Sequence, residues 1–317
     1  MAQHSHHHGD HHGDHHGDHH GDHHHGDHHG DHHHGAPGSG EADLALMLDL
    51  DAEVLRAHLE EVTAWLAELA GDLPVRRILD LGSGTGTGTF TLLRHFPGAR
   101  AIAVDGSPQM LHHLRGKARA LGVADRVSAV EADLDADWPD FHGVDLIWAS
   151  ASLHHMADPG RALREAFAAL RPGGLLAVIE LDGLPRFLPE DLGIGRPGLE
   201  ARCREALAHR HTEAVPHLGA DWGPYLSRAG FTVEAERRFD LELGDPLPEA
   251  AGRYAQAVLR RMRGALTGSA GADDLAVLDL LIDDDGPESV LRRDDLVVRT
   301  ERTVWAARRL AGGSGPE

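Results

Sequence analysis

The sequence predicts an α/β fold, in which a doubly wound, mainly parallel sheet is covered by helices on both faces. Five short apolar segments alternate with segments of helical periodicity between residues 77 and 182 of the 317-residue chain. The first apolar segment is followed by a glycine-rich turn. Several of the other apolar segments are followed by acidic or polar residues at their carboxyl ends. Strands that alternate with helices form parallel sheets, because each connection crosses over one face. One helix-covered sheet is therefore expected here.

Residues 1–40 differ sharply in composition from the rest. Between residues 4 and 34 the chain contains only His, Gly, Asp and one Ser, and such a segment lacks the apolar surface that folding requires. We expect a disordered tail and linker, followed by one domain over 41–317. Neighbouring imidazoles and carboxylates can chelate Ni²⁺, Zn²⁺ or Cu²⁺, so a metal-handling protein is an alternative function. The candidate metal ligands are His6, His7, His8, His11 and His12.

Charge and composition argue against several classes of partner. The formal net charge is -21, whereas nucleic-acid binding requires a basic surface. The single cysteine, Cys203, has no partner for an internal disulfide, and no apolar run approaches the roughly 20 residues of a membrane span. We therefore expect a cytoplasmic protein that acts on a small molecule, without nucleic acid or membrane, as a monomer or homodimer.

Each element of the predicted fold has its own signal. Apolar residues recur at helical spacing between Leu55 and Leu69, which predicts an N-terminal helix within 41–70. Ser107 and Pro108 are typical of a helix start. The predicted strands are 78–81, 101–105, 127–131, 144–149 and 175–180, and the other predicted core helices lie over 87–96, from Ser107 onward and around 161–170. Together with their connections these elements make a core over 71–182.

Polar residues follow the predicted strands at their carboxyl ends. Ligands of doubly wound sheets bind at that edge, so residues that are far apart in the chain should meet there. The residues at these positions are Gly82–Gly86, Asp105, Asp133, Ser150, His154 and His155. The sequence thus predicts a ligand site along one edge of the sheet.

The glycine turn does not fit the two commonest phosphate-binding motifs. The dinucleotide fingerprint needs Gly-x-Gly-x-x-Gly, but Thr87 or Thr89 occupies the third position in either register, which disfavours a nicotinamide-dependent oxidoreductase. A P-loop needs a lysine that the turn lacks. What remains is Asp80 with three alternating glycines, followed by Asp105, which can bind a pair of ribose hydroxyls. Asp133 can accept a hydrogen bond from an exocyclic amine such as that of adenine.

Five motifs then occur in order: Asp80-Leu-Gly-Ser-Gly-Thr-Gly86, Val104-Asp105-Gly-Ser-Pro-Gln-Met110, Glu131-Ala-Asp133-Leu134, Ser152-Leu-His-His155 and Leu170-Arg-Pro-Gly-Gly174. With them the chain from about residue 77 to 182 resembles the class I S-adenosylmethionine-dependent methyltransferases of the small-molecule type. The resemblance implies a Rossmann-like, seven-stranded sheet, whose last strand is antiparallel and inserted between its neighbours. Residues 231–239 and 296–305 alternate as the two further strands should.

The resemblance also implies a role for each residue of the edge. The methionine part of S-adenosylmethionine would lie against Gly82, Ser83, Gly84 and Gly86, with Asp80 near its amino group. The ribose would lie against Asp105 and Gly106, and the adenine against Met110, Asp133 and Leu134. The sulfonium side would face Ala149 and Ser150. Plainer explanations exist for some of them: Asp80 as a turn acid, Met110 as a core residue and Asp133 as a cap.

The implied reaction is an in-line SN2 methyl transfer, for which the protein mainly has to align the acceptor. A base is needed only if the acceptor must lose a proton. His154 and His155 are the first candidates for that base, followed by Glu180 and Asp182; shape and hydrogen bonding are the alternative role for the histidines.

The remaining segments should determine the choice of acceptor. Residues 183–222 are expected to form a helical cap, and residues 223–317 to contain two further helices and the last strands. The cap carries several arginines that could attract a carboxylate-bearing molecule, although arginines on a helix face are usually solvated. These are Arg186, Arg196, Arg202, Arg204 and Arg210.

Overall fold

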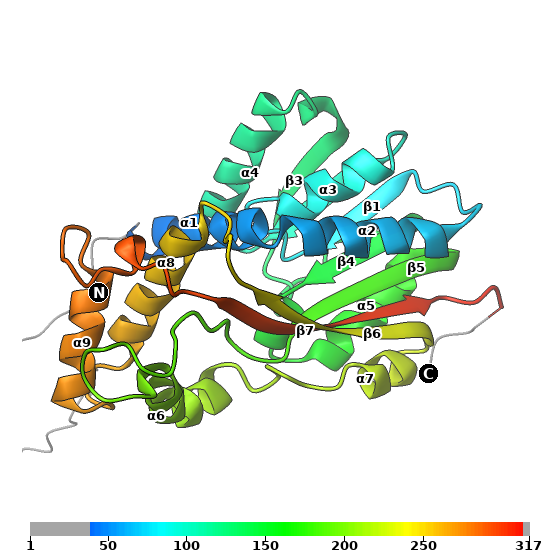
Figure 1. Cartoon of the computed structure of the whole chain (residues 1–317). Helices are drawn as coiled ribbons and strands as arrows, with labels where there is room; N and C mark the ends of the chain where they lie inside the picture. The colour runs from blue at the N-terminus through cyan, green and yellow to red at the C-terminus, as the bar shows by residue number, and fades with distance from the viewer. Residues whose placement is uncertain (1–38, 313–317) are drawn as a thin grey trace, which may run out of the picture. The chain divides into compact units, whose positions relative to one another are not determined.

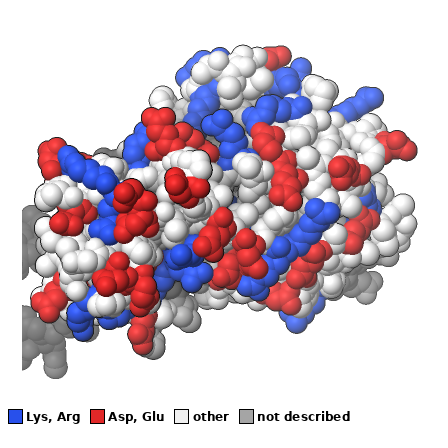
Figure 2. Space-filling model, in the orientation of Figure 1, with Lys and Arg blue, Asp and Glu red and all other residues white. Residues whose placement is uncertain are grey.

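The computed structural model describes residues 39–312, apart from the side chains of residues 39 and 209–214. The predicted tail, with its candidate metal ligands His6, His7, His8, His11 and His12, lies outside the described residues. Within 39–312, no helix is both long enough and apolar enough to cross a membrane. On the face shown in Figure 2, Lys and Arg side chains are interspersed with Asp and Glu side chains.

A seven-stranded sheet forms the centre of the fold (Figure 1). Its strands are β1 (Arg77–Leu81), β2 (Arg100–Asp105), β3 (Val127–Glu131), β4 (Val144–Ser150), β5 (Leu170–Leu181), β6 (Thr232–Leu243) and β7 (Val298–Arg308). They lie in the order β3-β2-β1-β4-β5-β7-β6. The first five are parallel, and β7 runs antiparallel to both β5 and β6. The predicted seven-stranded sheet with an inserted antiparallel last strand is confirmed.

Helices cover both faces of this sheet and pack together at one end of it. They are α1 (Ser39–Val54), α2 (Arg56–Ala70), α3 (Thr87–His95), α4 (Pro108–Ala120), α5 (Pro159–Ala169), α6 (Leu199–Ala214), α7 (Gly223–Arg228), α8 (Ala251–Ala265) and α9 (Ala272–Ile282), with short 3-10 turns at Ala124–Arg126, Leu153–His155 and Val290–Arg292. Apolar residues of α2 and α3 pack on one face, and those of α5 and α7 on the other. This doubly wound arrangement leaves the carboxyl edge of the strands free for a site.

The predicted N-terminal helix is interrupted. Leu55 has φ −99° and ψ 24°, so the chain leaves the helical conformation between α1 and α2. The two halves pack against different partners: Leu50 and Val54 join a cluster with α6, α8 and α9, whereas Val62 and Leu66 cover the sheet. One straight helix could not bury both apolar faces, and the periodicity alone did not reveal the break.

A second apolar cluster lies beyond the sheet. It brings together residues of α1, α6, α8 and α9 with Phe187 and Leu188, which follow β5. The two helices expected late in the chain are α8 and α9. In Figure 1 these elements lie together at one end of the sheet, so segments from both ends of the sequence build this part of the molecule.

Candidate active site

The glycine turn after β1 adopts a conformation that suits glycine alone. Gly82, Gly84 and Gly86 all have positive φ, of 68°, 52° and 87°, which side-chain-bearing residues rarely adopt. A Cβ on Gly82 would lie 2.5 Å from the Cβ of Ser152, and one on Gly86 would lie 2.8 Å from Leu114. The turn is therefore tightly packed between the loop after β4 and α4.

Asp105, at the end of β2, is fixed across this turn. Its Oδ2 accepts a hydrogen bond of 2.8 Å from the backbone N–H of Gly84, and its Oδ1 accepts one of 2.9 Å from that of Ser107. The hydroxyl of Ser107 caps α4 by accepting from the N–H of Met110. Each oxygen of an ionised carboxylate has a second lone pair, so Asp105 can still accept from two hydroxyls of a ligand.

Asp80 is a buried acid at the end of β1. Its side chain is about 2% exposed, and the hydroxyl of Thr89 donates to its Oδ2. Burial raises the pKa of Asp80 to about 7, the charge of Asp105 adds to the rise, and the Thr89 hydrogen bond opposes it. Among residues 39–312 no ion pair to Asp80 is present. A cationic group, such as an α-ammonium, would supply the missing countercharge.

Two further polar atoms at the turn have no partner. The hydroxyls of Ser83 and Ser152 are buried without a hydrogen bond to any described residue. Between Ser150 and Ser152, Ala151 has φ 50°, the one positive φ among described residues other than glycine. Strained backbone and unpaired buried hydroxyls are typical of binding sites. These features fit a polar ligand against the glycine turn, as the methionine part of S-adenosylmethionine would require.

The residues expected around the adenine differ from one another in exposure. Met110 is buried, with about 3% of its surface exposed, and Gly106 has room for a Cβ with only an ordinary contact to Ala132. Asp133 is exposed, and its Oδ1 accepts from the N–H of Asp135, which is the geometry of a turn. The Leu134 side chain is buried and its carbonyl accepts from Arg161.

The two histidines after β4 occupy different surroundings. His154 is buried and its Nδ1 contacts Oε2 of Glu180, whereas His155 is exposed. Oε1 of Glu180 accepts from the N–H of Leu153 at 2.9 Å, so this carboxylate holds the whole turn. Ala149 is buried between β1 and β5, and Ser150 is half-buried at the end of β4. The structure thus joins His154 to Glu180, a contact that spacing along the chain could not predict.

Helix α1 contacts the glycine turn and α4 directly. The Asp49 side chain accepts from the hydroxyl of Thr85 and forms an ion pair with Lys117 of α4. Glu41 accepts from the hydroxyl of Ser107, and Leu48 lies 3.1 Å from the place where a Cβ of Gly84 would be. Sequence reasoning missed these contacts, because nothing in the apolar spacing of 41–70 indicates which side chains meet the turn.

The part of the chain that the structure describes contains no group of three or more His, Cys, Asp or Glu residues able to hold a metal ion. The metal candidates of the sequence all belong to residues 1–38, which are not described.

Comparison with known proteins agrees with this geometry. Residues 79–176, about a third of the chain, match the family described as "Methyltransferase domain". The sheet order places the chain among doubly wound α/β proteins, whose ligands bind at the carboxyl edge of the strands. Within that class, residues 79–176 are similar to methyltransferase domains, and the curated relatives of this region are named as methyltransferases.

Curated relatives cover this same part of the chain. A trans-aconitate 2-methyltransferase of Acidovorax sp. (strain JS42) is 34% identical over 164 residues, which are 52% of this chain and 60% of the relative. A 27-O-demethylrifamycin SV methyltransferase of Amycolatopsis mediterranei (strain S699) is 38% identical over 130 residues, 38% of this chain and 46% of the relative. The chain therefore spans about half the length of the curated relatives it matches.

A solved structure of geranyl diphosphate methyltransferase in complex with S-adenosylmethionine aligns with a TM-score of 0.47 and 18% identity. The alignment covers 87% of this chain and 93% of that one.

Proposed function

We propose that the chain transfers a methyl group from S-adenosylmethionine to a small-molecule acceptor. The observation that carries the proposal is Asp105, whose two oxygens are each fixed by a backbone N–H, one from the glycine turn and one from Ser107. Each Asp105 oxygen keeps a lone pair that could accept from a ribose hydroxyl, and the adjoining glycine turn is closely packed. A nicotinamide oxidoreductase is disfavoured by the glycine register and by the antiparallel β7 inserted beside β5.

The residues of the edge divide the cofactor among them. The buried carboxylate of Asp80 and the unpaired hydroxyls of Ser83 and Ser152 would face its amino-acid part. Asp105 would hold its ribose. The remaining contacts would come from Gly82, Gly84, Gly86, Gly106, Met110, Asp133, Leu134, Ala149 and Ser150. When bound, S-adenosylmethionine supplies a methyl group on an already activated sulfonium.

His154 is the better candidate for a base. Its Nδ1 is held by Glu180, so its Nε2 is the nitrogen that can take a proton from an acceptor, and the carboxylate would stabilise the resulting imidazolium. His155 is exposed and lacks such a partner among the described hydrogen bonds, so we assign it a contact with the acceptor. Alignment of the acceptor beside the cofactor would supply most of the rate.

The names of the relatives support a small-molecule acceptor, since they act on trans-aconitate or on a rifamycin. The test is to incubate the full-length protein with methyl-labelled S-adenosylmethionine and a metabolite extract, and to search the products by mass spectrometry. A labelled product that disappears with the Asp105→Asn variant supports the proposal. S-adenosylmethionine binding without any labelled product from the extract would argue against it.

Three expectations from the sequence stay proposals beside this function. They are a cytoplasmic location, a monomeric or homodimeric state, and binding of Ni²⁺, Zn²⁺ or Cu²⁺ by the histidines of the tail. Kinetics with and without Ni²⁺ test whether a metal on the tail affects the activity; unchanged rates would remove that role.

A further inference from the structure

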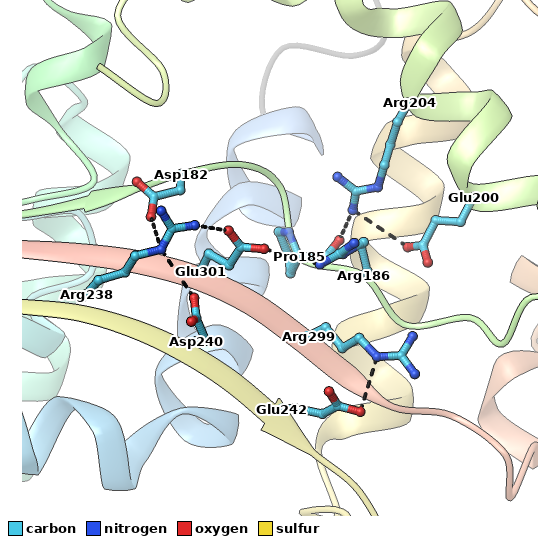
Figure 3. Close-up of polar contacts among 10 residues, drawn as sticks. All are labelled: Asp182, Pro185, Arg186, Glu200, Arg204, Arg238, Asp240, Glu242, Arg299 and Glu301. Carbon is cyan, nitrogen blue, oxygen red and sulfur yellow. Dashed lines mark hydrogen bonds and ion pairs between the residues drawn. The ribbon is translucent and has the colours of Figure 1, made fainter. Parts of the chain in front are cut away.

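A pocket lies where the chain leaves the carboxyl end of β5. It has a volume of about 170 Å³ and is lined among others by Asp182, Arg186, Arg204, Arg299, Thr300 and Glu301. Figure 3 shows these residues apart from Thr300. Asp182 directly follows β5, two residues beyond the Glu180 that holds His154. Two residues of a strand span roughly 7 Å. A small molecule anchored in this pocket could therefore reach the end of β5 where the candidate base lies.

The walls of the pocket are tied together by the backbone. The N–H of Arg186 donates to the carbonyl of Arg299 at 2.8 Å, and the N–H of Arg299 donates back at 2.9 Å. This pair of hydrogen bonds joins the segment after β5 to the segment that begins β7. Arg186 and Arg299 are consequently carried by a fixed backbone, which reduces the entropy lost when a ligand binds.

The acids at the pocket already have partners. Glu301 lies 2.6 Å from a guanidinium nitrogen of Arg238 and 3.4 Å from one of Arg186. Asp182 accepts from the hydroxyl of Thr303 at 3.0 Å and lies 3.9 Å from Arg238. Figure 3 shows Arg238 between these acids and Asp240. Their negative charges are thus offset by an arginine from outside the pocket lining.

Arg204 of α6 is less well satisfied. One of its terminal nitrogens donates to the carbonyl of Pro185, and Glu200 is 3.8 Å away. The carboxylate of Glu200 is itself occupied by the backbone N–H groups of Phe187 and Leu188. Nε of Arg204 is buried without a partner among residues 39–312. Burial lowers the pKa of Arg204. The charge of Glu200 opposes this lowering of the pKa, and the charge of the nearby Arg186 adds to it.

A second unsatisfied group lines the same pocket. Thr300 is about 3% exposed, and its hydroxyl has no hydrogen-bond partner in the described part of the chain. Buried donors without acceptors are costly and rare. A half-buried guanidinium whose Nε lacks an acceptor, and a buried hydroxyl without a partner, line one pocket, and together they indicate a ligand that accepts hydrogen bonds and carries negative charge.

The other described arginines that the sequence singled out in the cap do not combine an unpartnered nitrogen with a place at the pocket. Arg202 and Arg196 both pair with Asp274, at 2.7 Å and 3.2 Å, and neither lines the pocket. The side chain of Arg210 is outside the described residues. Of the five cap arginines that the sequence singled out, the structure places Arg186 and Arg204 at the pocket.

We propose that this pocket binds a carboxylate group of the methyl acceptor through Arg204 and Thr300. Arg186 and Arg299 lie beside them and are ion-paired with Glu301 and Glu242. The proposal rests on the proposed methyltransferase function and names its substrate class as small carboxylic acids. One guanidinium and one hydroxyl match the two oxygens of a carboxylate, and a volume of about 170 Å³ suits a small acid.

Calorimetry on the full-length protein, saturated with S-adenosylhomocysteine, tests this proposal. The probes are citrate and succinate, with triethyl citrate as the uncharged control and inorganic phosphate as the competing anion. We expect at least one of the two acids to bind and the ester not to bind. Arg204→Gln should weaken the binding about 30-fold or more, Arg204→Lys by less, and Thr300→Val several-fold.

Arg196→Gln is the matched control, because it removes the same charge from the cap outside the pocket; it should leave affinity within about twofold. The proposal fails if neither acid binds, if binding survives Arg204→Gln, or if phosphate alone shows the dependence on Arg204. Retained S-adenosylhomocysteine affinity shows that a variant is folded. Failure of the wild type to bind S-adenosylhomocysteine would instead overturn the proposed function.

Discussion

The glycine turn and the pocket at β5 and β7 lie at the same edge of the sheet but are built in different ways. The turn, Asp80 and Asp105 come from residues 80–107, and backbone N–H groups of Gly84 and Ser107 make the central hydrogen bonds, to Asp105. The pocket draws Asp182, Arg204 and Thr300 from three distant segments, and side chains provide its polar groups. A site defined by backbone leaves a contiguous motif in the sequence, whereas one defined by distant side chains does not.

The turn should tolerate substitution least. Gly82→Ala would place a Cβ 2.5 Å from Ser152 at φ 68°, which adds a clash to backbone strain of order 1–3 kcal/mol. We expect S-adenosylhomocysteine affinity to fall about 100-fold or more in calorimetry. Gly98→Ala is the control, because nothing lies within 4 Å of its Cβ position. Equal affinity in the two variants would contradict the placement of the ligand.

At the carboxyl end of β5, Glu180→Gln should affect turnover more than the binding of S-adenosylhomocysteine. The substitution keeps hydrogen-bonding capacity but removes the charge that would stabilise a protonated His154. We expect kcat to fall about 100-fold, as for loss of a general base, with little change in the affinity for S-adenosylhomocysteine. A normal kcat would assign His154 and Glu180 to structure alone.

Cofactor affinity should depend on the ionisation of Asp80. Because burial raises the pKa of Asp80 to about 7 in the free protein, the carboxylate is partly protonated near neutrality, and a ligand ammonium would favour its ionised form. Affinity should therefore rise about tenfold from pH 6 to pH 7.5 and level off above, with release of a proton. Asp80→Asn should abolish this dependence; a flat wild-type profile would contradict the role of Asp80.

The smallest effect concerns stability, at His58 of α2. This buried ring packs edge-on against Phe239 at 4.7 Å, and both its nitrogens are unpaired among the described residues. Burial lowers the pKa of His58 to about 4, Arg302 contributing and Asp51 opposing. The folded-state pKa lies below the unfolded one, so its stabilisation is present above pH 6.5 and is lost as pH falls toward 4.

Between pH 7 and pH 6 this shift corresponds to a loss of about 0.7 kcal/mol in the free energy of unfolding. Urea unfolding of the full chain and of His58→Leu at both pH values measures it. The variant should lose less stability than the wild type over that interval. An equal loss in both proteins would show that His58 does not titrate as its burial indicates.

The sequence predicted the sheet well, because strand periodicity and glycine spacing are local signals. It predicted that Asp105 and the glycine turn would lie along one edge of the sheet, where the N–H of Gly84 donates to Asp105. It did not predict the break at Leu55, since the partners that separate α1 from α2 come from α6, α8 and α9. It also treated His154 and His155 alike, whereas only His154 meets Glu180, 26 residues further on.

The cap arginines show the same limit. Nothing in the sequence distinguishes the five cap arginines from one another. In the structure Arg196 and Arg202 pair with Asp274 of α9, whereas Arg204 does not. Which charge is paired depends on contacts over about 70 residues of sequence, which no local pattern encodes.

Parallel titration of the full-length wild-type protein with S-adenosylmethionine and with NADH tests the central claim most directly. The account predicts saturable binding of one S-adenosylmethionine per chain and no binding of NADH, since the turn lacks the dinucleotide register. Binding of NADH without binding of S-adenosylmethionine would contradict it.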